Sequence, residues 1–218
     1  MACLLFDLDG TLTDPERGIT ACIQHALRAL GRDVPPAATL RQYIGPPLRV
    51  SFAAMLHSDE AALLDAALAH YRERFAATGL YENEVYPFVP AGLATLRAAG
   101  HRLWVATSKP TVYARRIVDH FDLAPFFEGV YGSELTGERT DKRDLVRHIV
   151  AMEGLTPGNT WMIGDRVHDI RGGRDNGTHT AGVLWGHGSA TELADAGAEV
   201  TVPSMAALVA HLAAIGAP

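Results

Sequence analysis

Short apolar runs alternate with helical patterns through most of this chain, and no other sequence feature restricts its possible folds so strongly. The apolar runs cover residues 3–8, 103–106, 130–131, 160–163 and 180–184. Helical patterns cover residues 91–99, 112–121, 142–152 and 169–176. Strands that alternate with helices at this spacing are typical of βαβ units with a parallel sheet. We therefore predict an α/β fold, a Rossmann-like doubly wound parallel sheet.

One long segment, residues 14–85, interrupts this alternation. It carries only helical signals, over residues 19–30, 48–56 and 59–77. We interpret it as an all-helical cap domain of residues 14–85, inserted into an α/β core domain of residues 1–13 and 86–218. Hinges are expected at residues 13–15 and 84–87. The tail, residues 203–218, has the pattern of a closing helix.

Charge and composition exclude several classes of protein. Acidic residues outnumber basic ones by 25 to 19, a net charge of −6, and no basic run offers a site for a nucleic acid polymer. No apolar stretch approaches the ~20 residues of a membrane span, and no basic leader precedes Asp7. Two cysteines cannot build a disulfide framework. We expect a cytoplasmic protein without membrane contact, either a monomer or a small homo-oligomer.

Polar residues follow the apolar runs where the strands should end. They are Asp7 and Asp9 at the end of the first run, Thr107, Ser108 and Lys109 after the second, and Asp165 and Asp169 after the fourth. Lys142 opens a helical pattern. The carboxyl ends of parallel strands share one edge of a sheet, where ligands gather. We therefore expect the acids, the Thr107 hydroxyl and lysine to converge there.

A cluster of this composition indicates phosphate chemistry. Clustered carboxylates repel one another unless a cation joins them, and a set of hard oxygen ligands favours Mg²⁺. A magnesium ion beside lysine and threonine suits a phosphate dianion. A carboxylate in that pocket can attack phosphorus and form an aspartyl-phosphate. Asp7 and Asp9 lie two residues apart, a spacing that can supply a nucleophile and an acid/base from one short segment.

The use of lysine supports this interpretation. Of the 19 basic residues, 17 are arginine, and Lys109 and Lys142 are the exceptions. Lysine provides a compact point charge that the wider guanidinium cannot reproduce. Both lysines belong to the expected cluster.

These motifs resemble those of the haloacid dehalogenase-like (HAD) hydrolase superfamily. The matching elements are DLDGT around Asp7, the strand-end Thr107, Lys142 and GDRVHD around Asp165, with a helical insert at the family's C1 cap position. The segments DPERGIT, YIGPPL, ATSKP and GSELTGERTDK resemble the branch of phosphoglycolate phosphatases and HAD-type 5′-nucleotidases.

The resemblance implies a role for each site residue. Asp7 would be the nucleophile and a Mg²⁺ ligand, and Asp9 the acid/base, with its backbone carbonyl also on the metal. Thr107 would bind the phosphoryl oxygens, with Ser108 and Lys109 beside it as substrate-binding residues. Lys142 would neutralise charge on the nucleophile and phosphate. Asp165 would ligate the metal, and Asp169 would hold metal-bound water or Lys142 from outside the ligand set.

One cap residue, Arg49, is a further candidate for substrate binding. It follows a turn-rich loop and could clamp an anionic group of the substrate. A solvated arginine on a helix fits the same pattern, and the sequence leaves both interpretations open.

The expected function is Mg²⁺-dependent hydrolysis of a small phosphorylated metabolite through an aspartyl-phosphate, with phosphoglycolate or a nucleoside 5′-monophosphate as substrate. A phosphomutase of the β-phosphoglucomutase kind shares the core residues and is an alternative that only the cap could decide. A phospho-accepting receiver module is a remote alternative, because here the candidate nucleophile follows the first strand and a cap is inserted. Dehalogenase chemistry is disfavoured by Asp9 and Asp165.

Overall fold

The apolar runs form strands because they are short, rich in branched side chains and buried on both faces, as parallel strands require. The structure is a computed structural model that describes residues 1–215. Within these residues a six-stranded parallel sheet has the order β5-β4-β1-β6-β7-β8. Its strands are β1 (Cys3–Phe6), β4 (Arg102–Pro110), β5 (Gly129–Ser133), β6 (Thr160–Gly164), β7 (His179–Val183) and β8 (Val200–Val202).

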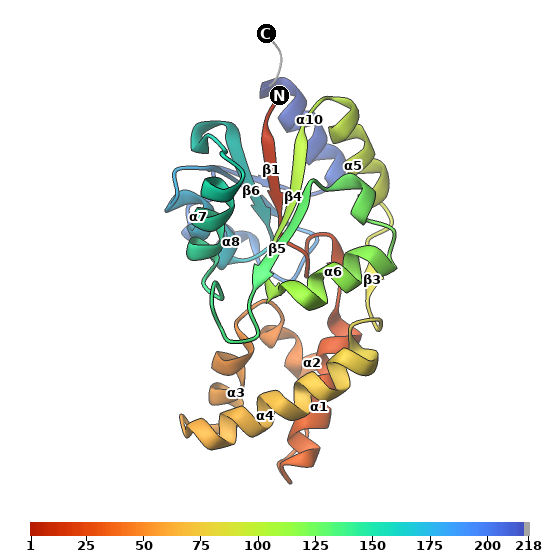
Figure 1. Cartoon of the computed structure of the whole chain (residues 1–218), viewed down its shortest axis with the longest axis vertical. Helices are drawn as coiled ribbons and strands as arrows, with labels where there is room; N and C mark the ends of the chain where they lie inside the picture. The colour runs from red at the N-terminus through yellow and green to blue at the C-terminus, as the bar shows by residue number, and fades with distance from the viewer. Residues whose placement is uncertain (216–218) are drawn as a thin grey trace. The chain divides into compact units, whose positions relative to one another are not determined.

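Helices cover both faces of this sheet (Figure 1). Helices α7 (Lys142–Met152) and α8 (Val167–Arg174) pack together on one face, against β4 to β7. The other face carries α5 (Val89–Ala98), α6 (Thr111–His120) and α10 (Met205–Ile215), and α9 (Ala190–Asp195) connects β7 to β8. Two 3-10 turns, η3 (Ala124–Phe126) and η4 (Pro157–Asn159), precede β5 and β6. The predicted α/β, doubly wound parallel fold is confirmed.

Side chains from three adjacent strands and one helix build much of the core. Leu5, Trp104 and Met162 meet Leu145 and Ile149 of α7, and none of these five side chains is exposed. Burying one large apolar side chain contributes roughly 1.5–3 kcal/mol. This packing fixes β1 between β4 and β6, so the residues that follow these three strands emerge beside one another.

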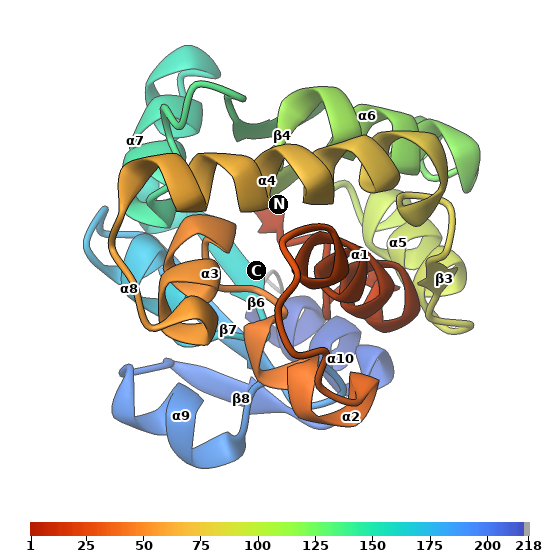
Figure 2. The same ribbon diagram turned by 90° about the horizontal axis from the view of Figure 1, so that it is seen from below.

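The chain divides into two compact units, residues 1–13 with 85–218 and residues 14–84. The second unit is helical, and Figure 2 shows its helices. They are α1 (Glu16–Ala29), α2 (Ala37–Leu40), α3 (Leu48–Leu56) and α4 (Ala61–Arg74), with the 3-10 turn η1 (Arg41–Tyr43) and the π-helical turn η2 (Phe75–Gly79). Tyr71 of α4 packs edge-on against Phe52 of α3 and stacks on Phe75. Strands β2 (Thr13–Asp14) and β3 (Glu84–Val85) pair where the chain passes between the units.

Several elements extend beyond what the patterns predicted. Strand β4 runs to Pro110, four residues past the apolar run, and α9 and β8 had no predicted counterpart. Both are short, and β8 alternates too briefly for its period to be recognised. The expected closing helix is α10, and residues 216–218 of that prediction lie outside the described residues. None of the helices within residues 1–215 is long and apolar enough to cross a membrane.

Candidate active site

The loop after β1 turns sharply and brings its acids to the edge of the sheet. Asp7 continues the strand, and its backbone N–H donates to the Ile163 carbonyl at 2.8 Å. The N–H groups of Leu12 and Thr13 then return to the Leu8 carbonyl. Gly10 has φ +82°, and a Cβ there would lie 2.3 Å from Asp165 Oδ2. Only glycine lets this loop approach the loop after β6 so closely.

Lys142 lies at the centre of the cluster. The Asp141 side chain caps α7 and so places Lys142 at the first helical position. The Lys142 ammonium is 2.8 Å from Asp7 Oδ1, 2.8 Å from Asp169 Oδ1 and 2.8 Å from the Ala106 carbonyl, to which it donates. The contacts with Asp7 and Ala106 are hydrogen bonds, and the contact with Asp169 is an ion pair. Burial alone would lower the pKa of Lys142, but Asp169 and Asp7 raise it above its ordinary value, so the ammonium stays charged.

The second lysine holds the second acid. Lys109 lies at the end of β4, and its ammonium is 2.9 Å from Asp9 Oδ2, with both side chains nearly buried. Thr107 is buried, and its hydroxyl oxygen accepts a hydrogen bond from the backbone N–H of Lys109 at 3.2 Å. The Ser108 carbonyl accepts the Ser133 hydroxyl at 2.9 Å, which ties the end of β4 to β5. Each lysine of the chain thus pairs with one acid of the loop after β1.

The remaining two acids follow β6. Asp165 is fully buried, and its Oδ2 accepts the backbone N–H of His187 at 2.8 Å. Asp169 lies in the first turn of α8, where its Oδ2 accepts the Arg166 N–H at 3.1 Å and its Oδ1 faces Lys142. One carboxylate therefore both caps a helix and positions the central lysine.

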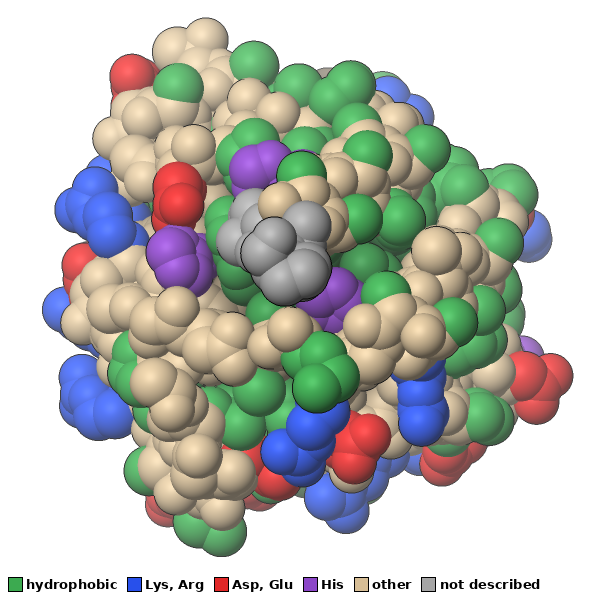
Figure 3. All heavy atoms as spheres, turned by 90° about the horizontal axis from the view of Figure 1, so that it is seen from above, with side chains coloured by type: hydrophobic (Ala, Val, Ile, Leu, Met, Phe, Trp, Pro, Cys, Tyr) green, Lys and Arg blue, Asp and Glu red, His purple; other side chains and the backbone are tan. Residues whose placement is uncertain are grey.

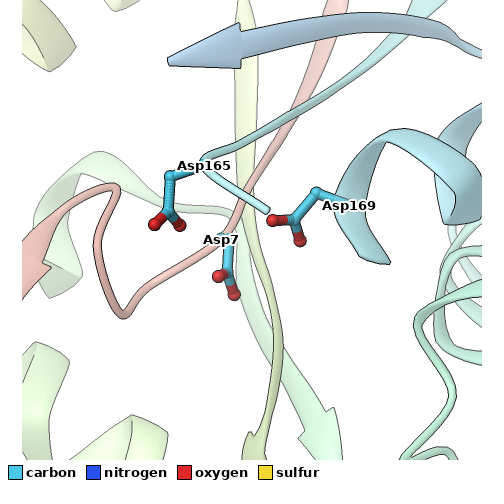
Figure 4. Close-up of side chains that lie close together, drawn as sticks. All are labelled: Asp7, Asp165 and Asp169. Carbon is cyan, nitrogen blue, oxygen red and sulfur yellow. The ribbon is translucent and has the colours of Figure 1, made fainter. Parts of the chain in front are cut away.

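Three of these carboxylates could hold a metal ion. Asp7, Asp165 and Asp169 each offer an oxygen, and these oxygens lie within 4.8 Å of one another (Figure 4). Burial and repulsion from Asp169 and Asp7 raise the pKa of Asp165 well above its usual range. Burial likewise raises the pKa of Asp169, although Lys142 opposes that effect. Burial is the first cause of both shifts and neighbouring carboxylates add to it, a situation that a bound cation would relieve.

The donor set fits a hard divalent cation. With Asp9 included, four buried acids face two lysines, which leaves two excess negative charges when all are ionised. Among residues 1–215, Asp9 Oδ1 is buried without a hydrogen-bond partner, so the site retains unused acceptor capacity. All candidate ligands are oxygens, the donors that Mg²⁺ prefers.

The predicted site residues divide between the two units. Six of them meet in the first unit: Asp7, Asp9, Lys109, Lys142, Asp165 and Asp169. Thr107 and Ser108 lie beside them at the end of β4. Arg49 belongs to the second unit, where its guanidinium is 2.5 Å from Asp65 and half exposed.

The segment after β7 contacts the site in a way that the sequence did not indicate. Residues 185–188 contact the loop after β1 and the loop after β6: the Trp185 indole donates to the Thr11 carbonyl at 3.0 Å, and His187 donates to Asp165. The run Trp185-Gly186-His187-Gly188 is typical of a turn, or of a segment that lines the entrance to a site, and does not by itself indicate these contacts. Its position after a predicted strand of the same parallel sheet was the signal that could have identified it.

A separate small hollow lies at the opposite, amino-terminal end of the sheet, on the face of the molecule that Figure 3 shows. It has a volume of about 70 Å³ and is lined in part by His101, Trp161 and His179. None of the predicted site residues lines it.

Comparison with known proteins places these motifs in a wider context. The sequence model of a family described as haloacid dehalogenase-like hydrolase matches residues 4–183. A 5′-nucleotidase of Pseudomonas aeruginosa is 51% identical over 87% of this chain and 86% of its own length. A phosphoglycolate phosphatase of Aquifex aeolicus is 27% identical over 86% of each chain.

Two further relatives are relevant to the chemistry. The tyrosine-protein kinase PtkA of Mycobacterium tuberculosis is 39% identical over 86% of this chain, and the match spans 63% of the kinase. The crystal structure of a "predicted phosphatase" from Clostridium acetobutylicum superposes with a TM-score of 0.94 at 38% identity and covers 98% of both chains.

Proposed function

This chain belongs to the haloacid dehalogenase-like hydrolase family and is a phosphatase of that family, and on that premise we propose that it hydrolyses nucleoside 5′-monophosphates through an aspartyl-phosphate on Asp7. The observation that carries the proposal is the contact of Asp7 with Lys142 inside a buried acidic cluster. A carboxylate in this setting is held in one orientation beside a fixed positive charge. Those are the requirements for a nucleophile that attacks an anionic phosphorus centre.

In the first step, a carboxylate oxygen of Asp7 bonds to phosphorus while the bond from phosphorus to the ester oxygen breaks. Lys142 offsets negative charge on Asp7 and on the phosphoryl oxygens, since its ammonium contacts Asp7 directly. Thr107, which is buried at the end of β4, donates a hydrogen bond from its hydroxyl to a phosphoryl oxygen.

Asp9 acts as the general acid in the first step and as the general base in the second. It protonates the departing ester oxygen and then takes a proton from the water that attacks the aspartyl-phosphate. Burial raises the pKa of Asp9, while Lys109 acts in the opposite direction. The raised pKa favours proton delivery near neutral pH. The second step returns Asp7 as a carboxylate and releases inorganic phosphate.

Asp7 and Asp165 would hold Mg²⁺, with the Asp9 backbone carbonyl as a further ligand and Asp169 oriented toward Lys142. When bound, the ion would supply a positive charge that lowers repulsion between Asp7 and the phosphate dianion. The oxygen donors and the excess negative charge support this assignment.

Substrate selection falls to groups other than the phosphate pocket, because that pocket recognises only the phosphoryl group. The helical unit is proposed as the cap that contributes such groups, with Arg49 as the candidate contact to the leaving part of the substrate. Ser108 and Lys109 are proposed to bind the substrate at the end of β4. The 51% identical relative named a 5′-nucleotidase supports a nucleotide over phosphoglycolate.

A second candidate function is transfer of a phosphoryl group to an acceptor other than water. The relative named tyrosine-protein kinase PtkA suggests transfer to a tyrosine hydroxyl, and a phosphomutase would transfer to a sugar hydroxyl. Hydrolysis is favoured because the relative with the higher identity bears the name of a hydrolase.

A substrate panel tests the proposal. Phosphate release would be measured with nucleoside 5′-monophosphates, phosphoglycolate, β-glucose 1-phosphate and p-nitrophenyl phosphate, each with Mg²⁺ and with excess chelator. Parallel reactions with ATP and a tyrosine peptide would be examined for phosphopeptide by mass spectrometry. We expect Mg²⁺-dependent release that is fastest with a nucleotide. Full activity in chelator would remove the metal from the proposal, and phosphopeptide without phosphate release would replace hydrolysis by transfer.

A further inference from the structure

Residues 185–188, named here the β7 clamp, lie against the candidate metal site. They follow β7, a strand that contributes no acid to this site. The β7 clamp leaves β7 at its carboxyl end and leads to α9. Its contacts reach both loops that carry the acids, the loop after β1 and the loop after β6. A segment that contacts both loops at once can set the position of one relative to the other.

Gly186 lies close to both of these loops. A Cβ at this position would lie 2.3 Å from the Gly10 carbonyl oxygen and 2.4 Å from Asp165 Cβ. Any larger residue at this position would therefore displace the backbone of the loop after β1 or the side chain of Asp165. The next residue, His187, directs its backbone N–H at Asp165 Oδ2 at 2.8 Å. This bond fixes the rotation of the buried carboxylate, because the donor belongs to the backbone and cannot reorient alone.

Trp185 anchors the β7 clamp. Its indole N–H donates to the Thr11 carbonyl at 3.0 Å, and Thr11 is fully buried. The ring also packs edge-on against Phe88, with 5.5 Å between ring centroids. The Thr11 hydroxyl faces the other oxygen of the same carboxylate, Asp165 Oδ1, at 3.4 Å. The residue that Trp185 holds is therefore itself in contact with Asp165.

We propose that Trp185 is a positioning residue for the metal site. Its indole N–H holds the β7 clamp against the loop after β1 and thereby keeps Asp165 oriented to bind Mg²⁺. The inference rests on the proposed function in that it takes the acidic cluster to be a Mg²⁺ site. Groups that orient metal ligands typically change metal affinity by about 10–100-fold when removed. Trp185 acts through two intermediaries, so we expect an effect near the lower end of that range.

The test is Trp185→Phe, which removes the N–H and keeps an aromatic ring against Phe88. The measurement is the rise in Tm on titration of chelator-treated protein with MgCl₂, which reports metal binding without turnover. Trp161→Phe is the matched control, since Trp161 is at the amino end of β6, stacked on His179 and away from the acids.

We expect Trp185→Phe to require about tenfold more Mg²⁺ for half of the Tm rise, and to recover its kcat once Mg²⁺ saturates. Trp161→Phe should titrate like the wild type. Gly186→Ala should weaken Mg²⁺ binding as well, because the added methyl group would force the β7 clamp away from Gly10 and Asp165. An unchanged Mg²⁺ midpoint in Trp185→Phe, with or without a lower Tm in chelator, would reduce Trp185 to a packing residue and overturn the inference. If the wild type itself shows no Mg²⁺-dependent rise in Tm, the proposed metal site fails together with the inference.

Discussion

Lys142→Arg tests whether the active site depends on the compactness of one ammonium. Lys142 Nζ serves three acceptors from a single atom: Asp7 Oδ1, Asp169 Oδ1 and the Ala106 carbonyl, each at 2.8 Å. A guanidinium spreads its five N–H donors over a planar fork of three nitrogens, so it cannot aim three of them at acceptors that converge on one point, and at least one contact is lost or lengthened. The stem of the Lys142 side chain also packs closely against Gly172, where a Cβ would lie 2.8 Å from Lys142 Cγ.

The expected loss follows from those contacts. One charge-assisted hydrogen bond contributes about 1.5–3 kcal/mol, which corresponds to a loss of roughly 10- to 150-fold in kcat/KM. Displacement of the nucleophile by the wider group adds to this, since a shift of about 1 Å can cost about 100-fold. We therefore expect kcat/KM to fall by about 10³–10⁴-fold, although the side chain keeps its positive charge.

The assay is phosphate release from a nucleoside 5′-monophosphate and from p-nitrophenyl phosphate, with the Tm measured in parallel. Arg143→Lys is the matched control, because Arg143 is the next residue of α7 and its side chain is half exposed. It should leave both activities unchanged. If Lys142→Arg retains turnover within about threefold of the wild type, the compact charge is not needed and the reasoning is wrong.

Three further predictions concern the nucleophile, the cap unit and the amino-terminal end of the sheet. Asp7→Asn should lower kcat by several orders of magnitude while circular dichroism stays native, because the covalent route is closed; activity within about tenfold of the wild type would exclude Asp7 as nucleophile. Arg49→Ala should cost about 1.5–3 kcal/mol in kcat/KM for a nucleotide and little for p-nitrophenyl phosphate, whereas Asp65→Asn should leave both unchanged; equal losses on both substrates in Arg49→Ala would contradict a contact with the leaving group. Burial lowers the pKa of His101 below its ordinary 6.5. As the pH drops through 6.5, the unfolded chain therefore binds more protons than the folded chain, and the free energy of unfolding falls. His101→Asn keeps an acceptor for the Ala2 N–H and should lose less stability between about pH 7.5 and 5.5 in urea unfolding; an equal loss would refute the role of His101.

The sequence alone determined the doubly wound sheet and most of the acidic cluster. Both depend on local signals: apolar runs at strand spacing, and acids or lysines placed directly after them. Parallel topology then brings the ends of β1, β4 and β6 together, so the meeting of Asp7 with Asp165 could be predicted without coordinates. Lys142 was recognisable because lysine is rare in this chain.

Tertiary structure decided which groups pair within that cluster. No spacing in the sequence indicates that Lys109 pairs with Asp9 while Lys142 pairs with Asp7, because these contacts join residues about a hundred or more positions apart. The role of residues 185–188 was also hidden, since their contacts with Asp165 use backbone groups and close packing at glycine, which leave no chemical signature in the side chains. Residue types and their order can identify strand ends and candidate ligands. The partner of each charge, and the backbone that orients it, depend on how the loops pack after the sheet has formed.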